Sequence, residues 1–441
     1  MNLKKYILLT IVSGGLFACS SDEAPVSGGE EPALKKGRLA LSVRSDKTDA
    51  TLTKADAPDA DVKTLTLGIF GEEWQIVHTS SATSLPDEDG NKNIDETTEP
   101  CSVYAGDAQI VVVANASAAL QAKLAGATSI DEFLSQISEL SEETLGSTGK
   151  GFTMSSKVFT VKFIGDNTLN YIGYGGKGDA VTTTHGEGIE IYGSTPVDLV
   201  RDVASVSLNS LTLSNEGNYN SSAFKLKEVF IANAKSLSLV ASSAEWGGIE
   251  KEFSTFPADY GKYWVGKTFE PALDQGSYKT GTQTTNSSLF QAAIATEGNE
   301  LSLKTGGISS WTTTDLSHPT AIGRKFYVYE NQKGETGETS KKNYTLLVIK
   351  GDYTYTLDNG EDMVLTDRYY PFIINDPEDS ATEYDGIEKH SYIKRNCQYE
   401  IDLTIAGPGS EYPYEPMIST NLSVGVKIVP WNVKRMHEEV E

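Results

Sequence analysis

The stretch Ile418-Ser-Thr-Asn-Leu422-Ser-Val424-Gly-Val426-Lys-Ile428-Val-Pro430-Trp431-Asn-Val433 lies near the end of the chain. Leu422, Val424, Val426 and Ile428 alternate with small or polar residues, which predicts an extended strand with one apolar face. Pro430 interrupts this strand, and Val429, Trp431 and Val433 are apolar in the opposite phase. A strand with an apolar face must bury it against a sheet. At a free C-terminus, that sheet can belong to the same molecule or to a neighbouring one.

Strand-like patterns dominate the rest of the chain, and 40 glycines punctuate them. The predicted strands are residues 37–44, 62–70, 108–114, 157–164, 188–192, 200–213, 224–232, 324–329, 344–350, 369–374 and 397–405. In residues 200–213 the apolar phase changes between Leu208 and Leu211. Only residues 117–140 have helical spacing; Ser117 can cap their start, and Gly126 divides them. This pattern predicts a mainly β chain of two β-sandwich domains, with a short helical insertion in the first.

The first residues carry an export signal. Lys4 and Lys5 precede an apolar run that ends at Leu16-Phe17-Ala18-Cys19. This predicts a lipoprotein signal peptide, residues 1–19, with a lipobox and lipidation of Cys19. The alternative is an ordinary signal peptide in which Cys19 is incidental. Residues 20–31 are rich in Ser, Gly, Pro and acids, and so predict a flexible tether.

Composition limits the functions that the chain can have. It has 441 residues and a formal net charge of −24, and its 37 basic residues form no dense cluster, which argues against binding nucleic acid. Its three cysteines, Cys19, Cys101 and Cys397, are far apart in sequence. We expect the last two to lie in different domains and to be unbridged.

No sequence motif predicts catalysis. The phosphate-loop-like letters at residues 146–151 lack the required first Gly and the final Ser or Thr, and a turn is the better prediction. The acidic residues 87–95 do not match a calcium loop, because Gly90 is the fourth residue and not the sixth. We therefore predict no enzyme activity, no cofactor and no metal site.

The two ends of the chain carry a family resemblance. The segment Ile393-Lys-Arg-Asn396-Cys-Gln-Tyr399-Glu-Ile-Asp402, followed by Leu422-Ser-Val424 and Val429-Pro-Trp431-Asn-Val433, resembles the C-terminal part of FimA-type fimbrillins. These are the major shaft subunits of the type V pili of Bacteroidota. Val111-Val112-Val113-Ala114-Asn115 and Val200-Arg201-Asp-Val-Ala204 also fit. The resemblance implies two transthyretin-like β-sandwich domains.

The resemblance also implies an assembly mechanism. A lipoprotein precursor reaches the outer membrane, and a trypsin-like protease cuts after the first strand. The removed strand would contain Leu39, Leu41 and Val43, and the donor strand of another copy, residues 421–434, would replace it. On full burial, the donor's six or seven large apolar side chains would contribute on the order of 10–15 kcal/mol before entropy is subtracted. The predicted domains are then a tether and propeptide (20–54), an N-terminal sandwich (55–198) and a C-terminal sandwich (199–441).

Three basic residues can mark the processing site. We favour cleavage after Lys54, because its position before the next strand matches the family's junction, although the family's usual residue is Arg. Arg44 and Lys47 are the alternatives.

The predicted function is a structural pilin of a surface fimbria used in adhesion and biofilm formation, with accessory tip and anchor subunits as partners. Two alternatives remain. One is a tip or anchor subunit of the same family. The other is a lipid-anchored carbohydrate-binding protein that uses Tyr353, Tyr355, Tyr369 and Tyr370 as a platform.

Overall fold

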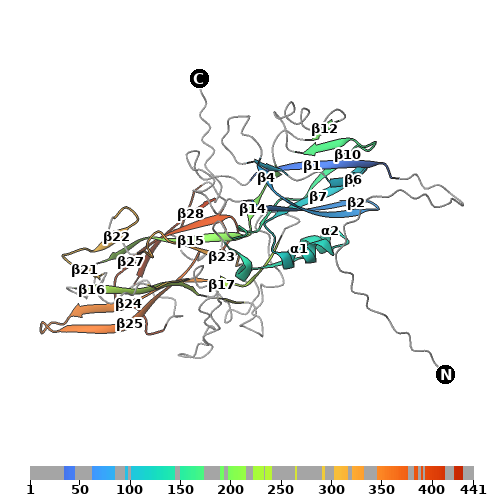
Figure 1. The fold of residues 1–441 in the computed structure, drawn as a ribbon. Helices are drawn as coiled ribbons and strands as arrows, with labels where there is room; N and C mark the ends of the chain where they lie inside the picture. Colours follow the sequence, from blue (N-terminus) through green and yellow to red (C-terminus); the bar gives the residue numbers. More distant parts are fainter. Residues whose placement is uncertain are drawn as a thin grey trace, which may run out of the picture. The chain divides into compact units, whose positions relative to one another are not determined.

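The computed structural model describes residues 34–44, 62–84, 95–97, 101–144, 149–172, 189–192, 197–214, 222–232, 234–240, 264–265, 291–293, 302–315, 320–331, 345–375, 382–385, 389–390, 393–412 and 422–430. Residues Lys35–Glu441 form one compact unit, and Met1–Leu34 form another, of which only Leu34 is described. Strands dominate the described residues, which contain two α-helices, so the predicted mainly β fold with a helical insertion is confirmed (Figure 1). Among the described residues, no helix has the length and apolar character required to cross a membrane.

Two sheets form the first sandwich. The strands of its first sheet are β1 (Lys36–Arg44), β4 (Thr83–Ser84), β5 (Asp95–Thr97), β6 (Cys101–Tyr104), β11 (Leu169–Ile172), β12 (Ile189–Tyr192) and β13 (Val197–Asp198). The strands of its second sheet are β2 (Thr64–Gly71), β3 (Gln75–Ser81), β7 (Gly106–Ala114), β9 (Met154–Ser155), β10 (Phe159–Phe163) and β14 (Val200–Arg201). Buried side chains from both sheets make one apolar core, which includes Leu39, Leu67 and Ile110.

The helical insertion covers the outer face of the second sheet. α1 (Ala118–Ala125) begins at Ser117, whose Oγ accepts a hydrogen bond from the Leu120 amide at 3.1 Å. α2 (Ile130–Leu134) follows after Gly126, as the sequence predicted. Their apolar side chains pack on Val111 and Val113 of β7. The helical prediction extends too far at its end, because β8 (Ile137–Glu139) is a strand that pairs with β18 (Leu237–Leu239), so a tertiary partner overrides the local pattern.

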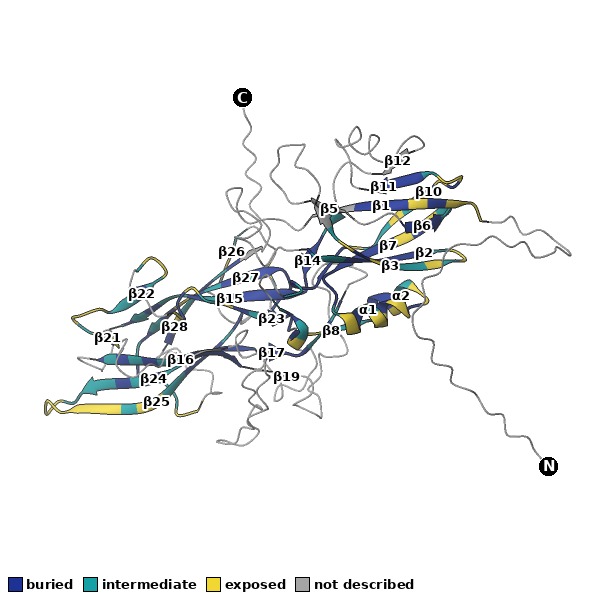
Figure 2. Cartoon of the chain, in the orientation of Figure 1, coloured by how far each residue is buried: buried dark blue, intermediate teal, exposed yellow. Residues whose placement is uncertain are grey.

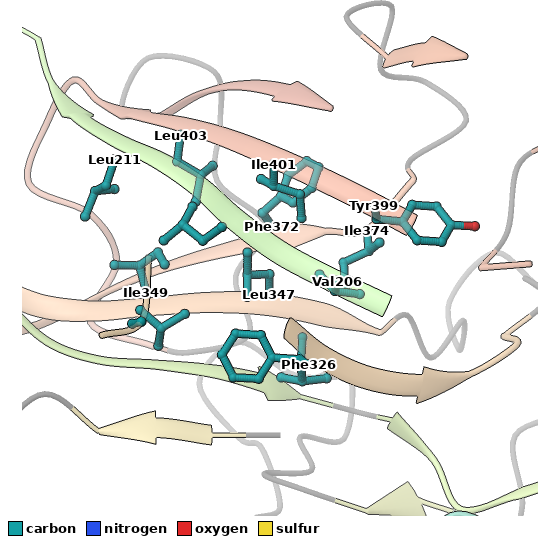
Figure 3. Close-up of a cluster of buried hydrophobic side chains, with 14 of the residues drawn as sticks. Val206, Leu211, Phe326, Leu347, Ile349, Phe372, Ile374, Tyr399, Ile401 and Leu403 are labelled. Carbon is teal, nitrogen blue, oxygen red and sulfur yellow. The ribbon is translucent and has the colours of Figure 1, made fainter. Parts of the chain in front are cut away.

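Two further sheets form the second sandwich. The strands of the first are β15 (Val203–Leu213), β22 (Ser310–Thr312), β23 (Lys325–Tyr329), β26 (Thr382–Tyr384), β27 (Cys397–Ile405) and β28 (Leu422–Pro430). The strands of the other are β16 (Ala223–Ala232), β20 (Gln291–Ala293), β21 (Ser302–Lys304), β24 (Leu346–Thr356) and β25 (Asp362–Ile373). Val206, Leu347, Phe372 and Ile401 belong to the core between them (Figure 3). The predicted phase change in β15 is a register shift between Leu208 and Ser210 against β27.

Buried charges join the two sandwiches. Arg395, which precedes β27, contacts Asp202 at 3.1 Å and Glu330 at 2.6 Å, and all three residues are at most 4% exposed. Burial raises the pKa of Asp202 well above its usual value, and the Arg395 guanidinium opposes this rise. Tyr329 of β23 donates a hydrogen bond, 2.9 Å long, to the carboxylate of Glu143. Glu143 lies in the chain segment that follows β8. Losing one member would leave a buried charge uncompensated, so removal of any one of these side chains would be strongly destabilising.

Candidate functional site: the first and last strands

β1 lies inside its sheet, with partners along both edges (Figure 1). On one edge it runs parallel to β11, from Arg38 opposite Leu169 to Leu41 opposite Ile172. On the other edge it runs antiparallel to β6, with Leu39 opposite Cys101. Its last residues pair with β5 and β13. The ladder hydrogen bonds of β1 are therefore satisfied from both sides.

Both faces of β1 are covered. Leu39 and Leu41 are 0% exposed and belong to the core of the first sandwich. Ala40 points to the opposite face and is still only 2% exposed. It lies opposite Tyr171 of β11, which is also buried. Removal of β1 would open a slot that is apolar on its inner face and that accepts only a small residue at the Ala40 level. We call this volume the β1 slot.

The N-terminal end of β1 is held by the turn between β10 and β11 and by Asn170, the second residue of β11. The buried Asn170 side chain donates hydrogen bonds to the carbonyl oxygens of Arg38 and Ile164, each at 3.0 Å. The Arg38 amide donates to the Thr168 oxygen at 2.9 Å. At Gly37, an added Cβ would lie 2.5 Å from the Ile164 carbonyl oxygen, so only glycine fits this close backbone approach.

Two cysteines lie in the sheets that hold the end strands. Cys101 of β6 and Cys397 of β27 are both buried and unbridged, and they belong to the cores of different sandwiches, as the sequence predicted. Burial raises the pKa of each thiol to about 12. Cys101 is opposite Leu39 of β1, and Cys397 is opposite Pro430 of β28.

β28 is integrated in its own molecule, where it follows β27 antiparallel from Leu422 opposite Ile405 to Pro430 opposite Cys397. On its other edge, β26 pairs with Val426–Ile428 only. Leu422, Val426 and Ile428 are buried in the second core, and Val424 is partly buried against it (Figure 2). Of the two possibilities that the sequence left open, this structure shows the strand in its own sheet.

Several predicted site residues lie at or beyond the edges of these strands. Arg44 is the last residue of β1, and its backbone is in register with Asp198 and Asp95. Val43 is opposite Val197 and Glu96, and Val429 is opposite Gln398. The residues that fall outside the described part of the chain are Cys19, Lys47, Lys54, Trp431 and Val433.

Two other candidates have structural roles. Lys150, in the phosphate-loop-like stretch, contacts the buried Glu143 carboxylate at 3.0 Å and the Asn115 carbonyl oxygen at 3.0 Å. Its ammonium group is therefore part of the junction network. In the proposed tyrosine platform, Tyr353 and Tyr370 are 0% exposed, so the four rings do not form a sugar-binding surface.

Comparison with known proteins identifies the family. The family model described as major fimbrial subunit protein (FimA) matches residues 13–201, and the FimA4 pilin C-terminal domain matches residues 267–431. The chain is 24% identical to a major fimbrium subunit FimA type-2 of Porphyromonas gingivalis, over 98% of both chains. It is 25% identical to a FimA type-4 subunit of the same species, again over 98% of both.

Solved structures show the same fold. A putative cell adhesion protein from Parabacteroides distasonis is 40% identical, with a TM-score of 0.68, over 91% of this chain and 100% of that one. A fimbrilin from Porphyromonas gingivalis W83 has a TM-score of 0.53 at 19% identity, over 90% of this chain and 98% of that one. The chain belongs to the FimA family of major fimbrial subunits.

Proposed function

We propose that this fimbrial subunit forms the shaft of a surface fimbria by donor-strand exchange. A trypsin-like protease removes β1, and the C-terminal strand of a second copy fills the β1 slot. Each copy then offers one slot and one donor. A head-to-tail contact of this type does not close on itself and so produces a fibre.

The observation that supports this proposal is the pairing of β1 along both edges, together with the burial of Leu39, Ala40 and Leu41. Leu39 and Leu41 each contribute about 1.5–3 kcal/mol through burial. Their removal uncovers apolar residues of both sheets and unpaired backbone groups of β6 and β11. An emptied slot is therefore a high-energy edge that favours the addition of an apolar strand.

The position of β28 changes the energetic account. The sequence alone suggested a gain on the order of 10–15 kcal/mol for burying a free tail. Because Leu422, Val426 and Ile428 are already buried against β27, moving them to a slot gains no new burial of these side chains. The driving force is the free energy gained when the strand fills the β1 slot minus the free energy lost when it leaves its place beside β27. Opening the slot by proteolysis supplies that difference.

We favour Lys54 over Arg44 as the processing site. A protease cleaves a peptide bond only where the backbone can separate locally from its neighbouring strands. The backbone at Arg44 is paired with a strand on each side, so cleavage there is disfavoured. We further propose that the precursor is anchored to the outer membrane through lipid on Cys19. In this scheme its partners are other copies, tip and anchor subunits and the protease, and the fimbria serves adhesion and biofilm formation.

The test is limited trypsin treatment of the purified precursor, followed by electron microscopy and N-terminal sequencing. We expect filaments only after cleavage, with a new N-terminus at Ala55. A Lys54→Ala variant that is cut at Arg44 or Lys47 and still forms filaments would move the site and keep the mechanism. Filaments from uncut precursor in which residues 34–44 remain protected would contradict donor-strand exchange.

A further inference from the structure

We infer that residues 382–385, which comprise β26 and Asp385, form a strap that retains β28 in its own sheet and sets how readily the donor is released. This inference rests on the proposed function, in which β28 must leave that sheet, and adds the element that regulates its departure. β26 pairs with β28 in parallel, with Thr382 opposite Val426 and Tyr384 opposite Ile428. Because β27 lies on the other edge, this part of β28 is bordered on both sides.

The strap lies where a terminal strand is held least firmly. Residues near a chain end separate from a fold first unless another segment ties them down. β26 pairs with the half of β28 that is nearer the C-terminus, whereas the other half is joined through the chain to β27. Pairing at this place therefore opposes fraying at the end from which β28 can separate without pulling on β27.

The strap acts mainly through backbone hydrogen bonds. The Asp385 amide donates to the Ile428 carbonyl oxygen at 3.0 Å. Ile428 is 0% exposed, so water could not replace this donor if it were lost. The Asp385 carboxylate also lies 3.4 Å from the Lys427 ammonium, but both side chains are 43% exposed. Water screens such an ion pair, so it adds little to the backbone pairing.

A strap at this place has two consequences for assembly. It stabilises the unassembled subunit, because Val426 and Ile428 remain buried in the second core while no slot is open. It also opposes exchange, because the pairs between β26 and β28 must break before β28 can move to another subunit. Weakening the strap should therefore speed filament formation without altering the β1 slot.

A matched pair of variants in the full chain tests the strap. Asp385→Pro removes the amide that bonds to Ile428, whereas Asp385→Ala keeps this amide and loses the exposed ion pair. In the uncut precursor, amide hydrogen exchange of β28 should be about tenfold faster in Asp385→Pro than in Asp385→Ala. After complete trypsin cleavage, light scattering should show that Asp385→Pro forms filaments severalfold faster, and Asp385→Ala should match the wild type.

A second pair keeps the test decisive if Asp385→Pro does not fold. Alternate residues of a parallel strand direct their amides to the same neighbour, so the Glu383 amide faces β28 as the Asp385 amide does. Glu383 is exposed, so Glu383→Ala is the control for Glu383→Pro. We expect the same order of exchange and assembly rates. Proline variants that exchange and assemble at the rates of their alanine controls would overturn the strap.

A reversible disulfide separates the strap from the proposed function. Glu383→Cys combined with Lys427→Cys puts two thiols on paired residues of neighbouring strands, which lie ~5 Å apart and within reach of a disulfide. The oxidised protein should form no filaments after cleavage, and a reductant should restore them. Filaments from fully oxidised protein would show that β28 does not leave its sheet, and the proposed function itself would fail. If oxidation blocks assembly but the proline variants match their alanine controls, the strap alone is refuted.

Discussion

β1 and β28 differ in how they are held, although their side chains alternate in the same way. Strands border β1 on both edges, and Leu39 and Leu41 are fully buried. β28 pairs along its full length with β27, but on its other edge β26 covers only Val426–Ile428, and Val424 is only partly buried. The end of β1 is also fixed by Asn170.

This difference assigns each strand to a step. A strand with two paired edges and a clamped end exchanges slowly, so its release calls for a broken covalent bond. A strand whose second edge pairs with described residues at three positions, as β28 does with β26, opens at lower free energy and can leave reversibly. The apolar pattern makes the two strands interchangeable, and the pairing around them decides which one leaves first.

Deleting residues 421–441 should have the largest effect. The processed protein then has a slot but no donor, so we expect no filaments by electron microscopy. Because Leu422, Val426 and Ile428 belong to the second core, the melting temperature should also fall. A chain that lacks only residues 435–441 is the matched control and should form filaments. Normal filaments from the longer deletion would refute the assignment of the donor.

Alanine substitutions in each strand compare how tightly the two strands are packed. Leu41→Ala removes a fully buried side chain and should lower the free energy of unfolding by about 2–5 kcal/mol. Val424→Ala shortens a partly buried side chain and should cost about 1 kcal/mol. Urea unfolding of the uncut precursor measures both. Equal costs would mean that β28 is packed as tightly as β1.

The sequence predicted the strands well because alternation over five or more residues has few competing explanations. β27, β7 and the start of α1 lie close to where the pattern put them. It did not reveal β8, whose strand form depends on β18 a hundred residues away. The Arg395 network was also missed, since three charged residues scattered between positions 202 and 395 carry no local pattern.

The sequence revealed the apolar faces of the candidate site but not the features that hold them. Gly37 of β1 and Asn170 of β11 both act through the Ile164 carbonyl, which lies in the turn before β11. A single glycine or asparagine in a strand-rich chain gives no signal of this kind. The same limit applied to β28, because one sequence cannot state which sheet covers a terminal strand.

Asn170→Ala should weaken the clamp on β1 without altering β28. The Arg38 and Ile164 carbonyls each lose a buried donor, a loss of about 1–3 kcal/mol. Amide hydrogen exchange should then be at least about tenfold faster in β1. Asn375, another fully buried asparagine, donates to the His390 carbonyl in the second sandwich, so Asn375→Ala is the control. Equal acceleration of β1 by both variants would show that the effect is not local.

The smallest expected difference is between the two native thiols of the uncut precursor. Burial raises the pKa of both to about 12, so alkylation at pH 8 requires the covering strand to open. Cys397, beside β28, should react a few-fold faster than Cys101, beside β1. The folded pKa of each thiol exceeds its unfolded pKa, so burial of the neutral thiols favours the folded state. This stabilisation is present below about pH 8.5 and is lost as pH rises above it. Cleavage should reverse the order, because Cys101 then borders an empty slot, and assembly should protect Cys101 again. If Cys101 stays unreactive after β1 has been cut and released, then no slot has opened, and the contrast between the strands has no role in assembly.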